Sequence, residues 1–210
     1  MRHLKLFESM TEIEVEKICK KYGIRNWTLN PDGTVDVDGS VYLSKKGLSK
    51  LPLKFGRVTG YFVCHNNQLT SLVGCPKEIG RDFRCDNNQL TSLVGCPTEI
   101  GGDFWCHSNK LTSLEGCPTE VGDSFWCYLN QLSSLKGAPE YIEGGVDFIP
   151  NNIIKEILDL NSYDKDIQKY ILKWQKEYSI WRKDGSFNQD RFILMMEDAG
   201  DELPKIKLPK

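Results

Sequence analysis

Cysteine is the residue of this chain whose spacing first suggests chemistry. Seven of the eight cysteines fall into two series with a 21-residue interval: Cys64, Cys85, Cys106 and Cys127, and then Cys75, Cys96 and Cys117. Zinc sites use cysteine pairs about two to four residues apart, a spacing that neither series provides. Ala138 replaces a cysteine of the second series without disturbing the surrounding phrase. We therefore expect inert, buried thiols in a reducing environment, and neither a metal nor a cofactor.

The interval belongs to an internal repeat. The phrase F-x-C-x-x-N-x-L-x-x-L recurs in four clear copies, which begin at Phe62, Phe83, Phe104 and Phe125. Weaker copies begin at Val41 and Val146, which brings the repeat region to about six coils over residues 40–154. A unit this short cannot bury its own apolar residues, so neighbouring units must stack into one continuous core. The Phe, Cys and Leu positions are the expected core.

Two further columns of the repeat are expected to be structural. One asparagine per coil falls where the chain leaves the strand, and a buried amide there can satisfy backbone groups of adjacent coils. The Gly-Cys-Pro phrase marks the turn to the other side of the coil, where Pro disfavours a long helix and leaves room for extended or 3₁₀ segments. The residues expected to be structural are Asn67, Asn88, Asn109, Asn130, Asn151, Cys64, Cys85, Cys106 and Cys127.

This phrase resembles the leucine-rich repeat L-x-L-x-x-N-x-L, with Phe and Cys at two of the aliphatic positions. The wording NNQLTSLxGCPxEIGxDFxC is also similar to repeat proteins encoded by large bacteriophages. The resemblance implies an α/β leucine-rich-repeat solenoid with short parallel strands. The bacteriophage likeness implies a host or viral protein as the partner.

The flanks differ from the repeats. Residues 10–22 read as an amphipathic helix that ends at Gly23, and a hairpin around Pro31, Asp32 and Gly33 follows. After Asn152 three segments favour helices, and Asp164 is a credible N-cap for the second of them. Because solenoid ends expose apolar core, we expect an N-terminal cap over residues 1–39, the solenoid over 40–154, and a C-terminal helical cap over 155–210. The alternative is that the C-terminal helices form a separate binding element.

The outward positions of the strands provide the candidate site. Side chains alternate along a strand, so the residue between the inward Phe and Cys faces outward. Trp105, Trp126 and Tyr128 are expected to be exposed aromatics on adjacent rungs of the concave side, with His107 beside them and Asp82, Asp86 and Asp103 in a polar rim. Clusters of Trp, Tyr and Arg are typical of binding hot spots. The expected partner-binding residues are Tyr61, His65, Arg84, Asp86, Trp105, His107, Trp126 and Tyr128.

Catalysis has little support. His65, Asp86 and His107 form one column, but the sequence offers no third strong metal ligand in register, no nucleophile with a paired base and no phosphate-binding glycine loop. We expect no enzymatic activity.

Charge and hydropathy exclude other classes. The formal net charge is −2, and residues 60–149 hold five Lys and Arg against eleven Asp and Glu. An acidic middle repels phosphate backbones, so nucleic acid is disfavoured and a partner with some basic character is favoured. No apolar run is long enough to cross a bilayer, which excludes a membrane protein and favours a cytoplasmic location.

The sequence therefore predicts a non-enzymatic interaction module that binds a host or viral protein in the cytoplasm and could inhibit a host enzyme or defence factor. The alternatives are a nucleotide-binding sponge that stacks a base between Trp105 and Trp126, and partner binding by the C-terminal helices. The sequence leaves the oligomeric state open.

Overall fold

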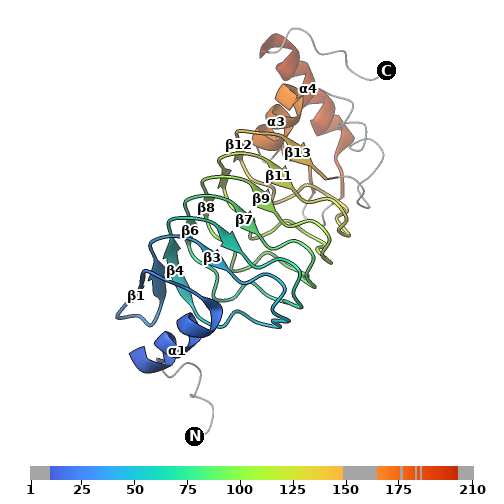
Figure 1. Cartoon of the computed structure of the whole chain (residues 1–210). Helices are drawn as coiled ribbons and strands as arrows, with labels where there is room; N and C mark the ends of the chain where they lie inside the picture. Colours follow the sequence, from blue (N-terminus) through green and yellow to red (C-terminus); the bar gives the residue numbers. More distant parts are fainter. Residues whose placement is uncertain (1–9, 149–164, 176, 183, 185, 203–210) are drawn as a thin grey trace, which may run out of the picture.

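The computed structural model describes residues 10–148, 165–175, 177–182, 184 and 186–202 of the 210-residue chain. In that part the chain winds into a solenoid of about five stacked turns of 21 residues (Figure 1). Two sheets, called sheet A and sheet B here, run along the solenoid, and a few helices lie at its two ends. This architecture is compatible with the leucine-rich repeat resemblance.

Sheet B contains the expected strands. Every pairing in it is parallel and is offset by one repeat, so that Phe83 pairs with Phe62 on one side and with Phe104 on the other. The order along the solenoid is β3 (Val41–Tyr42), β5 (Phe62–Val63), β7 (Phe83–Arg84), β9 (Phe104–Trp105), β11 (Phe125–Trp126) and β13 (Val146–Asp147). The prediction of short parallel strands at this position is confirmed.

Sheet A occupies the other side of each coil, where the sequence had suggested only extended or 3₁₀ segments. Its strands are β1 (Trp27–Leu29), β2 (Val35–Val37), β4 (Phe55–Val58), β6 (Glu78–Ile79), β8 (Glu99–Ile100), β10 (Glu120–Val121) and β12 (Tyr141–Ile142). All of its pairings are parallel except that of β1 with β2, which is the expected hairpin. In the two-residue strands the first side chain is exposed and the second is buried, so each coil adds one apolar residue to the core from this side.

A glycine at the corner between the sheets allows adjacent coils to approach closely. A Cβ atom on Gly101 would lie 2.4 Å from the carbonyl oxygen of Gly80, its counterpart one turn earlier. Only a residue without a side chain fits between two backbones at this distance.

The core lies between the two sheets and follows the repeat. The phenylalanines of sheet B stack along the solenoid, with ring centroids 5.3 Å apart for Phe83 and Phe104 and 5.4 Å apart for Phe104 and Phe125. Cys64, Cys85, Cys106 and Cys127 are fully buried beside them, as predicted. In the second series Cys75 is buried, whereas Cys96 and Cys117 are half-buried. All eight cysteines are free thiols.

The asparagine column has the predicted structural role. Asn88 donates through Nδ2 to the carbonyl oxygens of Cys64 and Cys85, and its Oδ1 accepts from the backbone N–H of Leu69. Asn67, Asn109 and Asn130 make equivalent bonds in their own coils. Asn151 lies outside the described residues.

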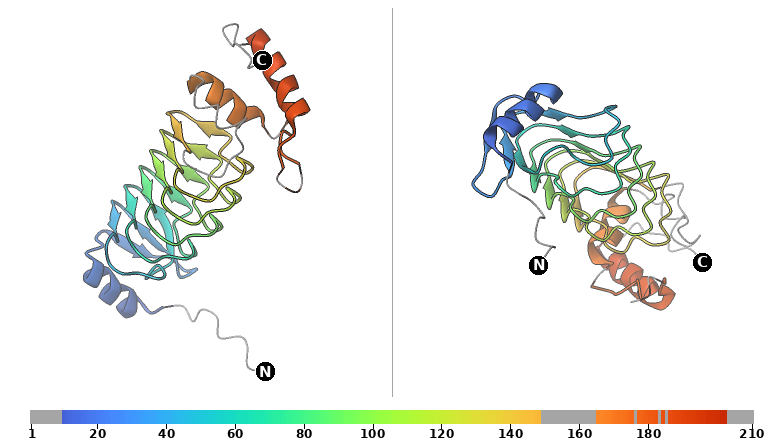
Figure 2. Two further views of the ribbon diagram at one scale, coloured as in Figure 1. Left: turned by 90° about the vertical axis from the view of Figure 1, so that its right-hand side faces the viewer. Right: turned by 90° about the horizontal axis from the view of Figure 1, so that it is seen from below.

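Helices lie at the two ends of the solenoid (Figures 1 and 2). The helix α1 (Glu12–Tyr22) begins with a capping box between Thr11 and Glu14, ends at Gly23 with φ of 69°, and buries Val15 and Cys19 in the core. At the other end, α3 (Lys165–Trp174) contacts β12 and α4 (Gln189–Glu202). Both of these helices were predicted.

Some expectations about the C-terminal region fall outside the structure. The first expected helical segment after Asn152 and the N-cap residue Asp164 lie outside the described residues, and the boundaries of the two caps stay predictions. None of the described helices combines the length and the apolar character that crossing a membrane would require.

Candidate interaction face

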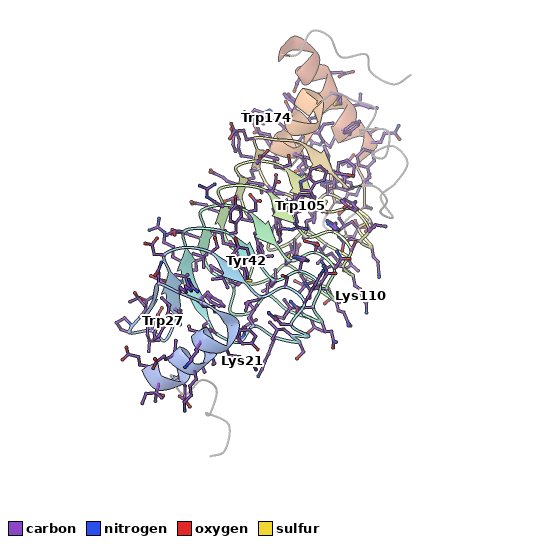
Figure 3. All side chains as sticks on the ribbon, in the orientation of Figure 1. Lys21, Trp27, Tyr42, Trp105, Lys110 and Trp174 are labelled. Carbon is purple, nitrogen blue, oxygen red and sulfur yellow. The ribbon has the colours of Figure 1, made fainter. Side chains whose placement is uncertain are left out.

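The outer side of sheet B carries the candidate site, which we call the aromatic face and define as Arg84, Asp86, Trp105, His107, Trp126 and Tyr128. Each of the six residues directly follows an inward Phe or an inward Cys in the sequence. The parallel hydrogen bonding between coils continues past the ends of the strands, from Cys85 N to Trp105 O and from Asn87 N to His107 O. The face therefore has a rigid backbone beneath it. Trp105 lies along the same sheet as Tyr42 (Figure 3).

Two tryptophans on adjacent strands form the centre of the face. Trp105 and Trp126 are paired in register, and their rings stack with centroids 5.0 Å apart and planes 23° apart. Neither ring belongs to the hydrophobic core, so the predicted outward direction is confirmed. Both rings are half-buried and not fully exposed, because each covers one face of the other.

Arg84 extends the stack by one rung. The central carbon of its guanidinium group lies 4.8 Å from the centroid of the Trp105 ring, within the range of a cation–π contact. Its Nε lies 3.3 Å from Oδ1 of Asp86. The guanidinium is therefore held in place by a ring on one side and by a carboxylate on the other.

Asp86 was expected to lie in an exposed polar rim, and this expectation is wrong. The residue is only 1% exposed. Its carboxylate accepts from Arg84 and from Nδ2 of Asn87 at 2.9 Å, and two imidazole nitrogens lie near Oδ2: Nδ1 of His65 at 4.0 Å and Nε2 of His107 at 3.8 Å. A buried carboxylate is costly unless it is paired and hydrogen-bonded. Asp86 therefore anchors the face from beneath and does not offer its carboxylate to a partner.

His107 is also more buried than expected, at 8% exposure. Its ring stacks on Tyr128 with centroids 4.3 Å apart and planes 7° apart, and it meets the edge of Trp105 at 5.8 Å. Burial lowers the pKa of His107 and of His65 below the usual value, although the nearby Asp86 carboxylate opposes the shift in both cases. Both imidazoles are therefore neutral at neutral pH and contribute packing surface, not charge.

The two indole N–H groups differ. Nε1 of Trp105 donates to Oδ2 of Asp103 at 3.3 Å. Nε1 of Trp126 is buried and has no acceptor among the described residues. The cause lies in the repeat: the counterpart of Asp103 one turn later is Ser124, and its hydroxyl accepts from Gly145 N and donates to Asp123. A buried donor without a partner costs about 1–3 kcal/mol.

The remaining expected site residues lie at the edges of the face. Asp82 and Asp103 were expected in the rim; both are half-buried, and each accepts a hydrogen bond from a backbone N–H of the next turn, those of Asp103 and Ser124. Tyr61 is half-buried beneath the guanidinium of Arg81, whose central carbon lies 5.6 Å from the ring centroid. Val63 lies between the inward Phe62 and Cys64, so alternation predicts that it faces outward, but it is only 8% exposed. The structure thus brings six of the eight expected residues into one continuous cluster. His65 is linked to this cluster by its contact with the Asp86 carboxylate, and Tyr61 lies apart from it.

The described residues contain no group of three or more His, Cys, Asp or Glu side chains that could hold a metal ion. Burial raises the pKa of the cysteine thiols, to about 11 for Cys19 and well above the usual value for Cys75, Cys96 and Cys117. Protonated thiols are poor nucleophiles and poor metal ligands. The site can stack, donate hydrogen bonds and exclude water.

Comparison with known proteins assigns no family: no family model, no curated protein and no solved structure matches the chain.

Proposed function

We propose that this protein is a non-enzymatic interaction module that binds a protein partner through the aromatic face. The observation that carries the proposal is the continuous stack of Arg84, Trp105 and Trp126 on the outer side of sheet B. Trp, Tyr and Arg are the residues that most often dominate binding energy in protein interfaces.

The stack is suited to binding because its side chains are already ordered. Ordering a flexible side chain on binding costs about 0.5–1.5 kcal/mol. Here Arg84 is fixed by Trp105 and Asp86, and Tyr128 is fixed by the ring of His107. Binding a partner therefore orders few additional side chains, because these side chains have already lost their conformational entropy on folding.

The partner's chemistry follows from polarity and charge. The guanidinium of Arg84 lies at one end of the stack and is half-exposed, so it can donate to a backbone carbonyl or another acceptor of the partner. The repeats carry more than twice as many acidic as basic residues, which favours a partner surface with basic character. The bacteriophage-like wording of the repeat supports a host or viral protein in the cytoplasm, and stoichiometric inhibition of a host enzyme or defence factor is the role that fits such binding.

The nucleotide-sponge alternative has less support from this geometry. A base inserted between two rings needs about two van der Waals separations, or about 7 Å between the ring planes. Trp105 and Trp126 have centroids 5.0 Å apart on strands whose spacing is fixed by the hydrogen-bond ladder. A base could stack only on the outside of the pair.

The test is partner capture from a bacterial extract with a matched set of variants. Trp105→Ala with Trp126→Ala should reduce recovery of a specific partner by about thirtyfold or more, because a hot-spot residue contributes about 2 kcal/mol or more. Tyr42→Ala is the control, since Tyr42 is an exposed aromatic on the same sheet, 56% exposed and outside the aromatic face.

A second pair of variants separates the aromatic face from the C-terminal helices. Ile193 and Leu194 are exposed apolar residues of α4, and Ile193→Glu with Leu194→Glu changes that surface alone. Loss of the partner with the α4 variant and retention with the tryptophan variant would transfer the binding role to the helices and refute our proposal.

A further inference from the structure

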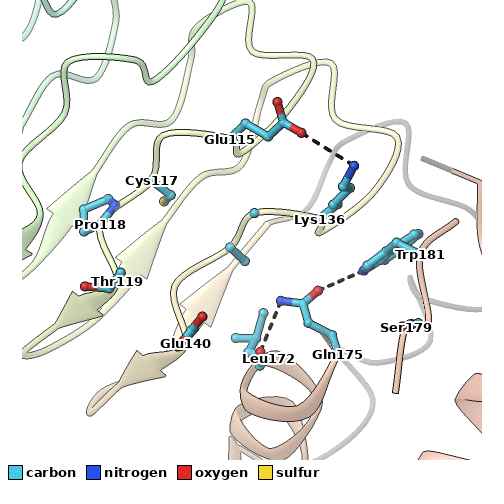
Figure 4. A pocket seen from close by; sticks show the side chains of 12 residues that line it. Glu115, Cys117, Pro118, Thr119, Lys136, Glu140, Leu172, Gln175, Ser179 and Trp181 are labelled. Atoms are coloured by element: carbon cyan, nitrogen blue, oxygen red, sulfur yellow. Dashed lines mark hydrogen bonds and ion pairs between the residues drawn. The ribbon is translucent and has the colours of Figure 1, made fainter. Parts of the chain in front are cut away.

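A cavity lies at the C-terminal end of the solenoid, lined by residues other than those of the aromatic face. It has a volume of about 340 Å³ and is bounded by the turn segments 115–119 and 136–140 of two successive coils on one side (Figure 4). Leu172 and Gln175 at the end of α3, together with Ser179 and Trp181, form the other side. A cavity of this size falls within the range that small-molecule ligands occupy.

The repeat changes its wording where it borders this cavity. At the position that follows the second leucine, earlier coils have Val73 and Val94, both exposed, whereas the cavity coils have Glu115 and Lys136. Two residues further on, the cysteine of the earlier coils becomes Ala138, which removes a sulfur atom from the cavity wall. The hollow is therefore larger than the repeat itself would leave.

The floor is apolar except for one amide. Pro118, Ala138 and Leu172 are buried and line it, together with the buried indole of Trp181. Gln175 is 5% exposed, accepts from Nε1 of Trp181 at 2.8 Å, and donates through Nε2 to the carbonyl oxygen of Leu172 at 3.2 Å. An amide nitrogen has two N–H groups, so one donor of Gln175 has no partner among the described residues. The nitrogen lies on the side of the turn segments (Figure 4).

The charges at the rim select against anions. Nζ of Lys136 lies 3.6 Å from Oε1 of Glu115, so the basic group among the described lining residues is paired with a carboxylate. A carboxylate or phosphate on a ligand would therefore find no unpaired basic group among the described residues of the lining.

We propose that this cavity is a binding site for a small, planar, uncharged aromatic molecule that carries one hydrogen-bond acceptor. The apolar floor takes the ring, and the second N–H of Gln175 donates to the acceptor atom. The site stands on residues other than those of the aromatic face, so it does not depend on the proposed function.

The test uses three probes that share one fused bicyclic ring system. Quinoline has a ring nitrogen as an acceptor, naphthalene lacks the acceptor, and 2-naphthoate carries a negative charge. In a titration of the full-length protein followed by ¹H–¹⁵N NMR, quinoline should shift the indole N–H of Trp181 and the side-chain amide of Gln175. Naphthalene should bind about fivefold more weakly, since one hydrogen bond is lost, and 2-naphthoate more weakly still. No shift of either resonance at about 1 mM quinoline overturns the proposal.

Two substitutions of Ala138 test whether quinoline binds in this cavity, because they fill it to different extents. Ala138→Cys restores the residue of the earlier coils and should fold normally while weakening quinoline, and Ala138→Leu should weaken it by more than about tenfold because it fills the cavity. Cys96→Leu is the matched control, since it adds bulk at the same repeat position two coils earlier, outside the cavity. Equal affinity in all three variants, or shifts confined to Trp105 and Trp126, would place quinoline elsewhere and overturn the proposal.

Discussion

The side-chain nitrogen of Asn109 lies 3.1 Å from the carbonyl oxygen of Cys85, one turn earlier, and 3.0 Å from that of Cys106 in its own turn. Its Oδ1 accepts from the backbone N–H of Leu90 at 3.0 Å. One side chain thus satisfies three buried backbone groups of two successive turns, which joins the turns independently of the sheets.

Asn109→Ala should therefore destabilise the protein strongly. The substitution leaves the N–H of Leu90 without its acceptor, and a buried unsatisfied group costs about 1–3 kcal/mol. The carbonyl oxygens of Cys85 and Cys106 each lose one of two amide donors, since Asn88 and Asn130 still donate to them. We expect the free energy of unfolding, measured with urea, to fall by about 2 kcal/mol. Gln89 is exposed and directly precedes Leu90. Gln89→Ala should leave the free energy of unfolding within about 0.5 kcal/mol of the wild type. A loss of stability from Asn109→Ala as small as that from Gln89→Ala would show that the asparagine column is dispensable.

The sequence was sufficient to predict this column because its residues repeat with the period of the coil. The same is true of the Phe, Cys and Leu positions, whose burial follows from stacking identical units. Sheet A was not predicted, since strands of two residues, such as Glu99–Ile100, are too short to show an alternation of apolar and polar residues.

Burial on the outer side of sheet B could not be predicted from alternation alone. Alternation correctly placed Asp86 and His107 outside the core, but their exposure to solvent depends on the size of the neighbouring side chains on the same side of the sheet. Arg84, Trp105 and Tyr128 lie on the same or adjacent rungs and cover them. The unpaired N–H of Trp126 was equally hidden, although the replacement of Asp103 by Ser124 in the next repeat is a signal that could have indicated it.

The corner glycines provide a second prediction. Gly101→Ala would place a Cβ atom 2.4 Å from the carbonyl oxygen of Gly80, so adjacent turns must separate at the corner between the sheets. Overpacking of this kind costs about 1–3 kcal/mol, and we expect a loss near the upper end because the opposing atom is backbone. Glu99→Ala, at an exposed position two residues earlier, is the control in the same urea measurement. An unchanged midpoint for Gly101→Ala would mean that the coils are not packed this closely.

Leu129 provides a prediction of the opposite sign. It has φ of 51° and is 50% exposed, and its counterparts in earlier turns, Asn66 and Asn87, have φ of 54° and 53°. The left-handed conformation is unfavourable for leucine and tolerated by asparagine. Leu129→Asn should therefore raise the free energy of unfolding by about 0.5–1 kcal/mol. Leu129→Val, a β-branched residue, should lower it, and a rise with valine would contradict the backbone explanation.

The buried histidines lead to a prediction about pH. Burial lowers the pKa of His65 and His107 below about 6.5, the value expected in the unfolded chain. As the pH falls below that value, the unfolded chain binds protons that the folded protein resists, so the free energy of unfolding should decrease as the pH falls from about 7 to about 5.5.

The charged groups around the two imidazoles act in opposite directions, so the direction in which stability changes with pH is a test of the explanation. Asp86 favours the protonated form of both rings, and Asp147 that of His107, whereas Arg84 opposes protonation of both and Lys45 that of His65. Urea unfolding of the wild type and of a His65→Gln, His107→Gln variant at the two pH values measures the balance. The variant should lose less stability on acidification. If the wild type instead becomes more stable at about pH 5.5, the Asp86 carboxylate outweighs the burial of the rings, and the aromatic face rests on a charged imidazolium pair.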